Sequence, residues 1–133
     1  MFLQIQNVLS AAQVEAIRER VESHPQDFED GRRTAGWHAK AVKDNEQAKG
    51  ETAAAIREVV EKSLLAHPVF KAAAMPQSFV KTVVSRYRPG MSYGTHVDDA
   101  LMGGLRTDLS FTLFLSEPDT YDGGALVVEG NDG

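Results

Sequence analysis

The stretch that decides the fold class lies at residues 109–116 and reads Leu109-Ser110-Phe111-Thr112-Leu113-Phe114-Leu115-Ser116. Apolar side chains occupy every second position, and a period of two residues is typical of a β-strand with one buried face. Before it, residues 79–87 are rich in β-branched and aromatic side chains, which predicts a second strand. The intervening and following segments predict a turn at 89–90, an extended segment at 92–98, a loop at 102–104, a turn at 118–124 and a short strand at 125–129.

The first half of the chain predicts helices instead. Ser10 lies three residues before Gln13, which is a capping-box pattern, and apolar residues follow at helical spacing, so we predict a helix over residues 11–23. A second helix is predicted over residues 45–66, with Gly50 favouring a start at about residue 50. Shorter elements are predicted at residues 69–74 (one further helical turn) and at residues 1–8 and 34–42 (strands).

Helices followed by closely spaced strands predict the α+β class and one domain with two regions. Residues 1–77 are expected to be an N-terminal helical support region, and residues 78–133 the first part of a β core. About four or five strands are visible, fewer than a complete jelly roll needs. The final Asn131-Asp132-Gly133 has the composition of a turn, so we expect closing strands to follow it.

Composition describes an ordinary globular chain of 133 residues, of which 42% are apolar and 25% charged. The absence of cysteine excludes disulfides and thiolate metal sites and suits a reducing compartment. The net charge of −5 and the lack of a basic stripe argue against nucleic acid as a partner. Residues 1–13 lack the basic region and long apolar stretch of a signal peptide, so we expect none there, and no apolar run approaches the roughly 18 residues of a membrane span. We therefore expect a cytoplasmic protein without a membrane partner, of undetermined oligomeric state.

The tripeptide His96-Val97-Asp98 carries the strongest chemical signal. Residues two apart on a strand point to the same face, so His96 and Asp98 would present an imidazole and a carboxylate side by side. These are two of the three ligands of the facial triad that binds non-haem Fe(II) and leaves positions open. The alternative is a histidine at a strand end beside a solvated acid, because the tripeptide also occurs by chance.

The residues around this tripeptide resemble a known family. The resemblance is carried by Ser85-Arg86-Tyr87-Arg88-Pro89-Gly90-Met91-Ser92-Tyr93-Gly94-Thr95-His96-Val97-Asp98 and by residues 106–117 and 122–126. These stretches resemble the prolyl-hydroxylase branch of the Fe(II)- and 2-oxoglutarate-dependent dioxygenases. The bacterial PKHD-type, PiuC-like hydroxylases are the most similar members of that branch.

The resemblance implies a fold, a reaction and a set of ligands. The fold is a partial double-stranded β-helix (jelly roll) with the N-terminal helices packed on it. The reaction is hydroxylation with Fe(II) as the metal, 2-oxoglutarate as co-substrate and L-ascorbate (vitamin C) as the accessory reductant, and a link to bacterial iron uptake goes with it. His96 and Asp98 are implied as metal ligands, Tyr87 as a contact of the 2-oxoglutarate carboxylate, and Tyr93 as an aromatic beside the metal.

Part of the family's site has no counterpart in the chain. The distal histidine ligand and the arginine that binds 2-oxoglutarate are expected beyond residue 133, so residues 1–133 alone are expected to be inactive. His24, His38 and His67 are poor substitutes, because two of them precede prolines at helix ends and His38 lies beside Trp37. Two alternatives stay open: an inactive fragment with a structural or weak metal-binding role, and a cupin-like barrel. The substrate, small-molecule or peptidyl, is also open.

Overall fold

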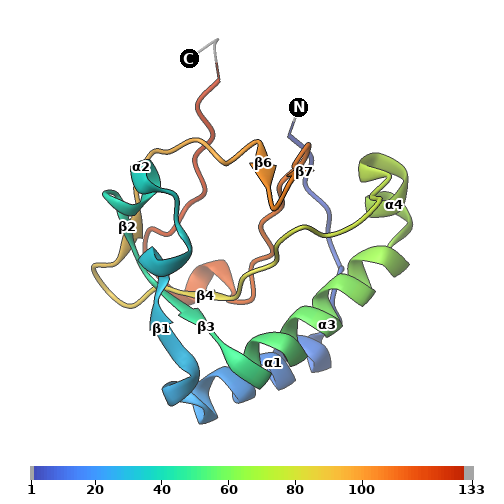
Figure 1. The fold of residues 1–133 in the computed structure, drawn as a ribbon. Helices are drawn as coiled ribbons and strands as arrows, with labels where there is room; N and C mark the ends of the chain where they lie inside the picture. The colour runs from blue at the N-terminus through green and yellow to red at the C-terminus, as the bar shows by residue number, and fades with distance from the viewer. Residues whose placement is uncertain (1, 131–133) are drawn as a thin grey trace.

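A computed structural model describes residues 2–130 (Figure 1). Its helices are α1 (Ala11–Ser23), α2 (Trp37–Lys40), α3 (Gly50–Ala66) and α4 (Pro68–Ala74), with 3-10 turns η1 (Pro25–Asp27), η2 (Gly31–Thr34) and η3 (Pro118–Thr120). Its strands are β1 (Phe28–Asp30), β2 (Lys43–Asp44), β3 (Glu46–Ala48), β4 (Ser85–Arg86), β5 (Ser92–Tyr93), β6 (Leu101–Met102) and β7 (Leu105–Arg106). Helices and antiparallel strands occur together, which confirms the α+β class. The turn predicted at residues 131–133 lies outside the described residues.

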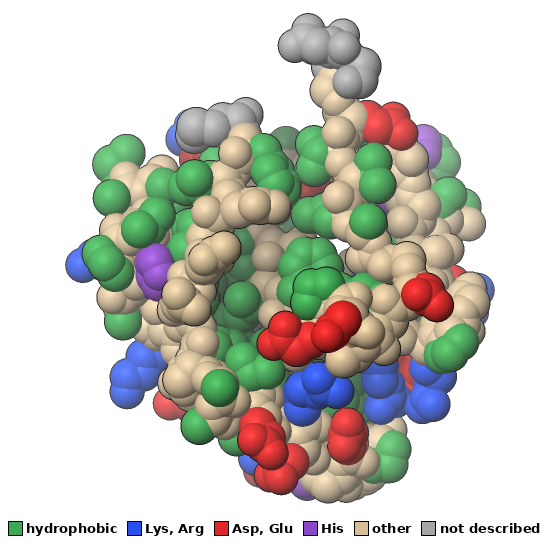
Figure 2. Space-filling view, turned by 180° about the vertical axis from the view of Figure 1, so that it is seen from behind, with side chains coloured by type: hydrophobic (Ala, Val, Ile, Leu, Met, Phe, Trp, Pro, Cys, Tyr) green, Lys and Arg blue, Asp and Glu red, His purple; other side chains and the backbone are tan. Residues whose placement is uncertain are grey.

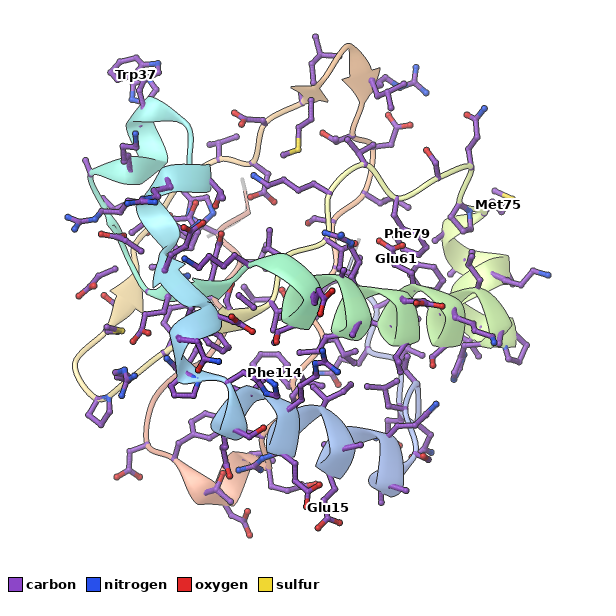
Figure 3. All side chains as sticks on the ribbon, turned by 60° about the horizontal axis from the view of Figure 1, so that its bottom comes forward. Glu15, Trp37, Glu61, Met75, Phe79 and Phe114 are labelled. Carbon is purple, nitrogen blue, oxygen red and sulfur yellow. The ribbon has the colours of Figure 1, made fainter. Side chains whose placement is uncertain are left out.

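Helix α1 begins where the capping box predicts. The Ser10 hydroxyl accepts a hydrogen bond from the Gln13 backbone N–H at 3.1 Å, and the Gln13 side chain accepts one from the Ser10 N–H at 2.9 Å. These bonds satisfy N–H groups that have no partner inside the helix. The predicted range 11–23 is confirmed, and α1 lies alongside α3 with Ile17 buried between them and the rest of the core (Figures 1 and 3).

Helix α3 supplies the largest part of the hydrophobic core. Ile56, Val60 and Leu64 recur every four residues on one face and are all at least nine-tenths buried. The helix begins at Gly50, so the later of the two predicted starts is confirmed, and residues 46–48 form β3 instead. The helical turn predicted after Pro68 is confirmed as α4. No helix among residues 2–130 combines the length and the apolar character that a membrane crossing requires.

Three small antiparallel sheets place the rest of the chain: β1-β3-β4, β2-β5 and β6-β7. Strands β2 and β3 are separated only by Asn45, so residues 43–48 form one extended run, here called the central segment. Its second half pairs with β4, with Glu46 opposite Arg86, and its first half pairs with β5, with Lys43 opposite Tyr93. The central segment therefore holds both strands that flank the Pro89-Gly90 turn.

The short-range strand predictions in the first half are wrong. Residues 34–42 contain the end of η2 and helix α2, because the Asp30 carboxylate caps η2 through the Arg32 N–H at 2.9 Å and the chain turns back on itself. Trp37, within the range 34–42 predicted as a strand, projects outward from α2 with 79% of its surface exposed (Figure 3). Residues 2–8 have no strand partner. Of the loop predicted at residues 102–104, Met102 belongs to β6, and Gly103 and Gly104, both with positive φ, form the turn of the β6-β7 hairpin.

The long strands predicted in the second half form only in part. Of residues 79–88, Ser85–Arg86 alone form a strand, and residues 109–116 and 125–129 form no strand. Their apolar side chains still pack: the Phe70, Phe79 and Phe111 ring centroids lie 6.0–6.4 Å apart. Alternation of apolar residues predicts which side chains pack against the core. It does not predict strand pairing, because pairing also requires a neighbouring backbone.

Residues 109–116 and 125–129 leave large apolar side chains at the surface. Leu109, Phe114 and Val127 are each more than half exposed. On the back of the molecule, hydrophobic side chains gather around a hollow (Figure 2). Residues 2–130 do not form the two facing sheets of a jelly roll, so the jelly-roll part of the fold prediction is not confirmed.

Candidate metal centre

The His96-Val97-Asp98 tripeptide follows β5 in a loop rather than in a strand. We predicted that the pleat of a strand would align the two side chains, and this is wrong, because β5 ends at Tyr93. The loop nevertheless brings them together, because His96 Nε2 lies 3.3 Å from Asp98 Oδ1. Val97, between them, is 91% exposed. One imidazole nitrogen and one carboxylate oxygen thus converge at the surface.

The His96 ring is held in place on two sides. Its Nδ1 lies 2.7 Å from the Gly94 carbonyl oxygen, so a proton on Nδ1 is donated there and Nε2 keeps its lone pair. The Tyr93 ring stacks on the imidazole with centroids 3.7 Å apart and an interplanar angle of 9°. Metal-binding histidines are commonly oriented by such a bond from the second ring nitrogen to a carbonyl. The side chain of His96 is 24% exposed and that of Asp98 is 64% exposed.

A third donor is not found nearby. Within residues 2–130, no group of three or more histidine, cysteine, aspartate or glutamate side chains could hold a metal ion. His24 Nδ1 lies 3.0 Å from the Arg20 carbonyl at the end of α1, as expected for a histidine near a helix C-terminus. His67 accepts a hydrogen bond from the Val69 N–H, and His38 stacks on Trp37. The other three histidines therefore have structural contacts away from the tripeptide.

The two predicted tyrosines lie on either side of the Pro89-Gly90 turn. Tyr87 is 49% exposed, and its hydroxyl accepts a hydrogen bond from Asn45 Nδ2 at 2.9 Å. Because Asn45 occupies one lone pair of that oxygen, the phenolic O–H remains able to donate. Burial raises the pKa of Tyr93, and the nearby Asp98 carboxylate adds to this, so Tyr93 stays neutral at physiological pH.

Arg86 and Arg88, within the residues 85–98 that carry the family resemblance, form ion pairs that stabilise the fold. Arg86 Nη2 bonds Glu46 Oε2 at 2.7 Å, and Arg88 Nε bonds the other oxygen of the same carboxylate. These hydrogen bonds, first from Arg86 and then from Arg88, lower the pKa of Glu46. Arg106 likewise pairs with Asp108 at 2.6 Å on the surface. Each of the three guanidiniums is thus paired with a carboxylate, and Arg86 Nε is buried without a hydrogen-bond partner.

The central segment contributes a feature that the sequence analysis missed. Lys43, Asn45 and Gln47, here called the polar row, alternate along it and are all buried, with 3–7% of their surface exposed. Each meets a different partner: the Tyr93 ring, the Tyr87 hydroxyl and the Thr34 hydroxyl. The hydropathy pattern could not reveal this row, because the intervening Asp44 and Glu46 are also polar.

Gly94 is the tightest point of the site. A Cβ added there would lie 2.9 Å from Val42 Cβ, while the Gly94 N–H donates to the Val42 carbonyl at 2.8 Å. Gly94→Ala is therefore expected to separate β5 from β2 and lower the free energy of unfolding by about 1–3 kcal/mol, measured by urea denaturation. Gly130→Ala is the control, because a Cβ there meets nothing within 4 Å. Equal stability of the two variants would contradict the packing described.

Comparison with known proteins identifies relatives along the whole chain. No family model matches it. It is 49% identical to a PKHD-type hydroxylase of Acaryochloris marina, over 100% of this chain and 61% of the relative. It is 50% identical to a PKHD-type hydroxylase of Maricaulis maris (100% and 60%) and 50% identical to one of Parvibaculum lavamentivorans (97% and 59%). The chain thus spans about three fifths of the length of these relatives. Over all of its 133 residues, the chain is thus similar in sequence to PKHD-type hydroxylases.

Proposed function

We propose that this chain contributes His96 and Asp98 as two ligands of the Fe(II) centre of a 2-oxoglutarate-dependent hydroxylase. The observation that carries the proposal is the 3.3 Å separation of His96 Nε2 and Asp98 Oδ1. Two donors at neighbouring corners of an octahedron, each about 2.1 Å from a metal, lie about 3 Å apart. Nitrogen and oxygen donors without sulfur also suit Fe(II).

The residues around the pair support this role. The Gly94 carbonyl and the Tyr93 ring fix the imidazole so that Nε2 faces Asp98, which reduces the ordering that metal binding would require. When bound, Fe(II) together with 2-oxoglutarate supplies the activation of O₂ that hydroxylation needs. We assign Tyr87 to the co-substrate, because its O–H is free to donate to a carboxylate while Asn45 holds its oxygen. Tyr93 forms the aromatic wall of the pocket.

The proposal extends to the domain and its setting. Residues 1–77 act as a helical support and residues 78–133 as the first part of a jelly-roll core, with the third metal ligand and the arginine for 2-oxoglutarate supplied from outside residues 2–130. L-Ascorbate serves as the accessory reductant. A cysteine-free chain suits the reducing cytoplasm. The substrate is a small molecule or a peptidyl residue, in a role linked to iron uptake.

The test uses a fusion of residues 1–133 to the part of the Maricaulis maris relative that lies beyond the match. Succinate formation from 2-oxoglutarate is measured with Fe(II) and ascorbate under air. We expect turnover by the fusion and only background from residues 1–133 alone, because the described residues provide two donors. The intact Maricaulis maris protein, assayed in parallel, is the positive control. Iron-independent succinate formation by the fusion would contradict the proposal.

A second candidate is a weak metal-binding module without turnover. It is favoured by one observation: residues 2–130 offer no group of three metal-ligating side chains. A folded fusion that binds Fe(II) but forms no succinate, beside an active intact relative, would select this candidate.

A further inference from the structure

The polar row places a lysine ammonium inside the protein without a counter-ion. Lys43 is 7% exposed. Its Nζ donates to the Thr34 hydroxyl at 3.3 Å and lies 5.0 Å from the centroid of the Tyr93 ring. Both partners are neutral. No carboxylate oxygen of residues 2–130 lies within ion-pair distance of this ammonium.

This arrangement is costly unless a ligand completes it. An ammonium has three donors, and burying a cation with incomplete bonding carries a large desolvation penalty. Burial, and then the charge of Lys81, lowers the pKa of Lys43. Asp30, the acid that opposes this effect from a distance, is already bonded through both oxygens to Arg32. The site therefore has an excess of positive charge.

A second ammonium approaches the same point. Lys81 Nζ donates to the Thr34 backbone carbonyl at 2.8 Å, so both lysines contact Thr34. Thr34 and Lys81 are exposed, which means that solvent reaches the place where the two side chains meet. The Thr34 hydroxyl directs its own proton to Gln47 Oε1, so the two ammonium groups are the donors that this place offers to a small anion.

This cationic site adjoins the candidate metal centre. Lys43 lies opposite Tyr93 in the β2-β5 pair, and Tyr93 stacks on His96. The Tyr93 ring thus contacts both the imidazole and the ammonium. The ring therefore links the cationic site to the candidate metal centre through contacts on the same side chain.

We propose that Lys43 and Lys81 form a binding site for a carboxylate anion at Thr34, next to the Tyr93 ring that stacks on His96. The assignment of this carboxylate to a substrate rests on the proposed function, and it makes that substrate an acid rather than a neutral molecule. The same chemistry is present in 2-oxoglutarate, so the two sources are separated by experiment. Binding is tested on the metal-free chain, so its outcome is independent of whether Fe(II) binds.

Isothermal titration calorimetry of metal-free residues 1–133 uses three probes: N-acetylglycine, its neutral amide and 2-oxoglutarate. We expect at least one of the two carboxylates, N-acetylglycine or 2-oxoglutarate, to bind, and we expect the neutral amide not to bind. Lys43→Met keeps most of the side chain's length without its charge and is expected to weaken carboxylate binding about tenfold or more. Its thermal midpoint should equal or exceed that of the parent, because a buried charge has been removed. Loss of N-acetylglycine binding identifies a substrate site, and loss of 2-oxoglutarate binding alone identifies a co-substrate site.

Lys40→Met is the matched control, because Lys40 is exposed on α2 and the substitution removes the same charge. It should leave the affinities unchanged. A folded Lys43→Met variant that binds both carboxylates as tightly as the parent overturns the proposal, as does a parent that binds neither. If Lys43→Met does not fold, Lys81→Met decides, because Lys81 is exposed: unchanged affinity for both carboxylates in that variant also overturns it.

Discussion

Replacing His96 with alanine is expected to reduce succinate formation by the fusion protein to background, a loss of more than about 100-fold. The substitution removes one of the two donor atoms that meet at 3.3 Å and leaves Asp98 as a single exposed carboxylate. A single carboxylate in water holds a divalent cation weakly, because water competes for both partners. Anaerobic calorimetry with Fe(II) should show the same loss of binding in residues 1–133 alone.

The fold should be unaffected by this change, because His96 lies in a loop whose backbone bonds involve Gly94 and Val42. His38→Ala is the control: it removes an exposed imidazole whose ring contact is with Trp37. Its Fe(II) affinity and succinate formation should match those of the parent. Full activity of the His96→Ala fusion would remove His96 from the metal centre and leave its stacking on Tyr93 as its role.

Replacing Ile56 with alanine is expected to lower the free energy of unfolding by about 3–4 kcal/mol. Ile56 is 2% exposed at the middle of α3, and it belongs to the core cluster with Ile17, Val60 and Leu64. The loss combines the transfer free energy of three carbon atoms with the cavity that rigid neighbours cannot fill. Since small domains are stable by only about 5–15 kcal/mol, the thermal midpoint should fall by many degrees.

Leu65→Ala provides the comparison within the same helix. Leu65 is 46% exposed, so the same truncation should cost less than about 1 kcal/mol. Both variants introduce alanine, which has a high helix propensity, so the difference in the free energy of unfolding between them reports mainly burial. Urea denaturation followed by circular dichroism measures both. Similar losses for the two variants would show that α3 does not form the core as described.

The elements that could be predicted from sequence are those fixed by nearby residues. The Ser10–Gln13 capping box and the helical spacing behind it define α1, because both act within one or two turns. Gly50 similarly indicated the start of α3. Strand predictions failed where the partner is remote: residues 109–116 have an ideal alternation, yet the described chain offers no backbone for them to pair with.

The candidate site was found by its chemistry rather than by its geometry. His96 and Asp98 meet because Gly94 allows the loop to pass close to Val42 and then accepts a bond from the imidazole, which no period-two pattern expresses. The polar row was invisible for a different reason. A buried lysine and a buried asparagine among acidic neighbours have the hydropathy of an exposed segment, and only the pairing with β4 and β5 distinguishes them.

The double pairing of the central segment also determines how the protein opens by local fluctuations. One backbone run holds β4 through one half and β5 through the other, so neither tyrosine can lose its support without disturbing the other. Amide hydrogen exchange along residues 43–48 and 85–93 should therefore proceed as one cooperative unit with a common opening free energy. The α1 terminus can fray separately, because its cap depends only on its own residues. The pairing that supports Tyr87 and Tyr93 is thus lost or kept as a whole, in an equilibrium distinct from global unfolding.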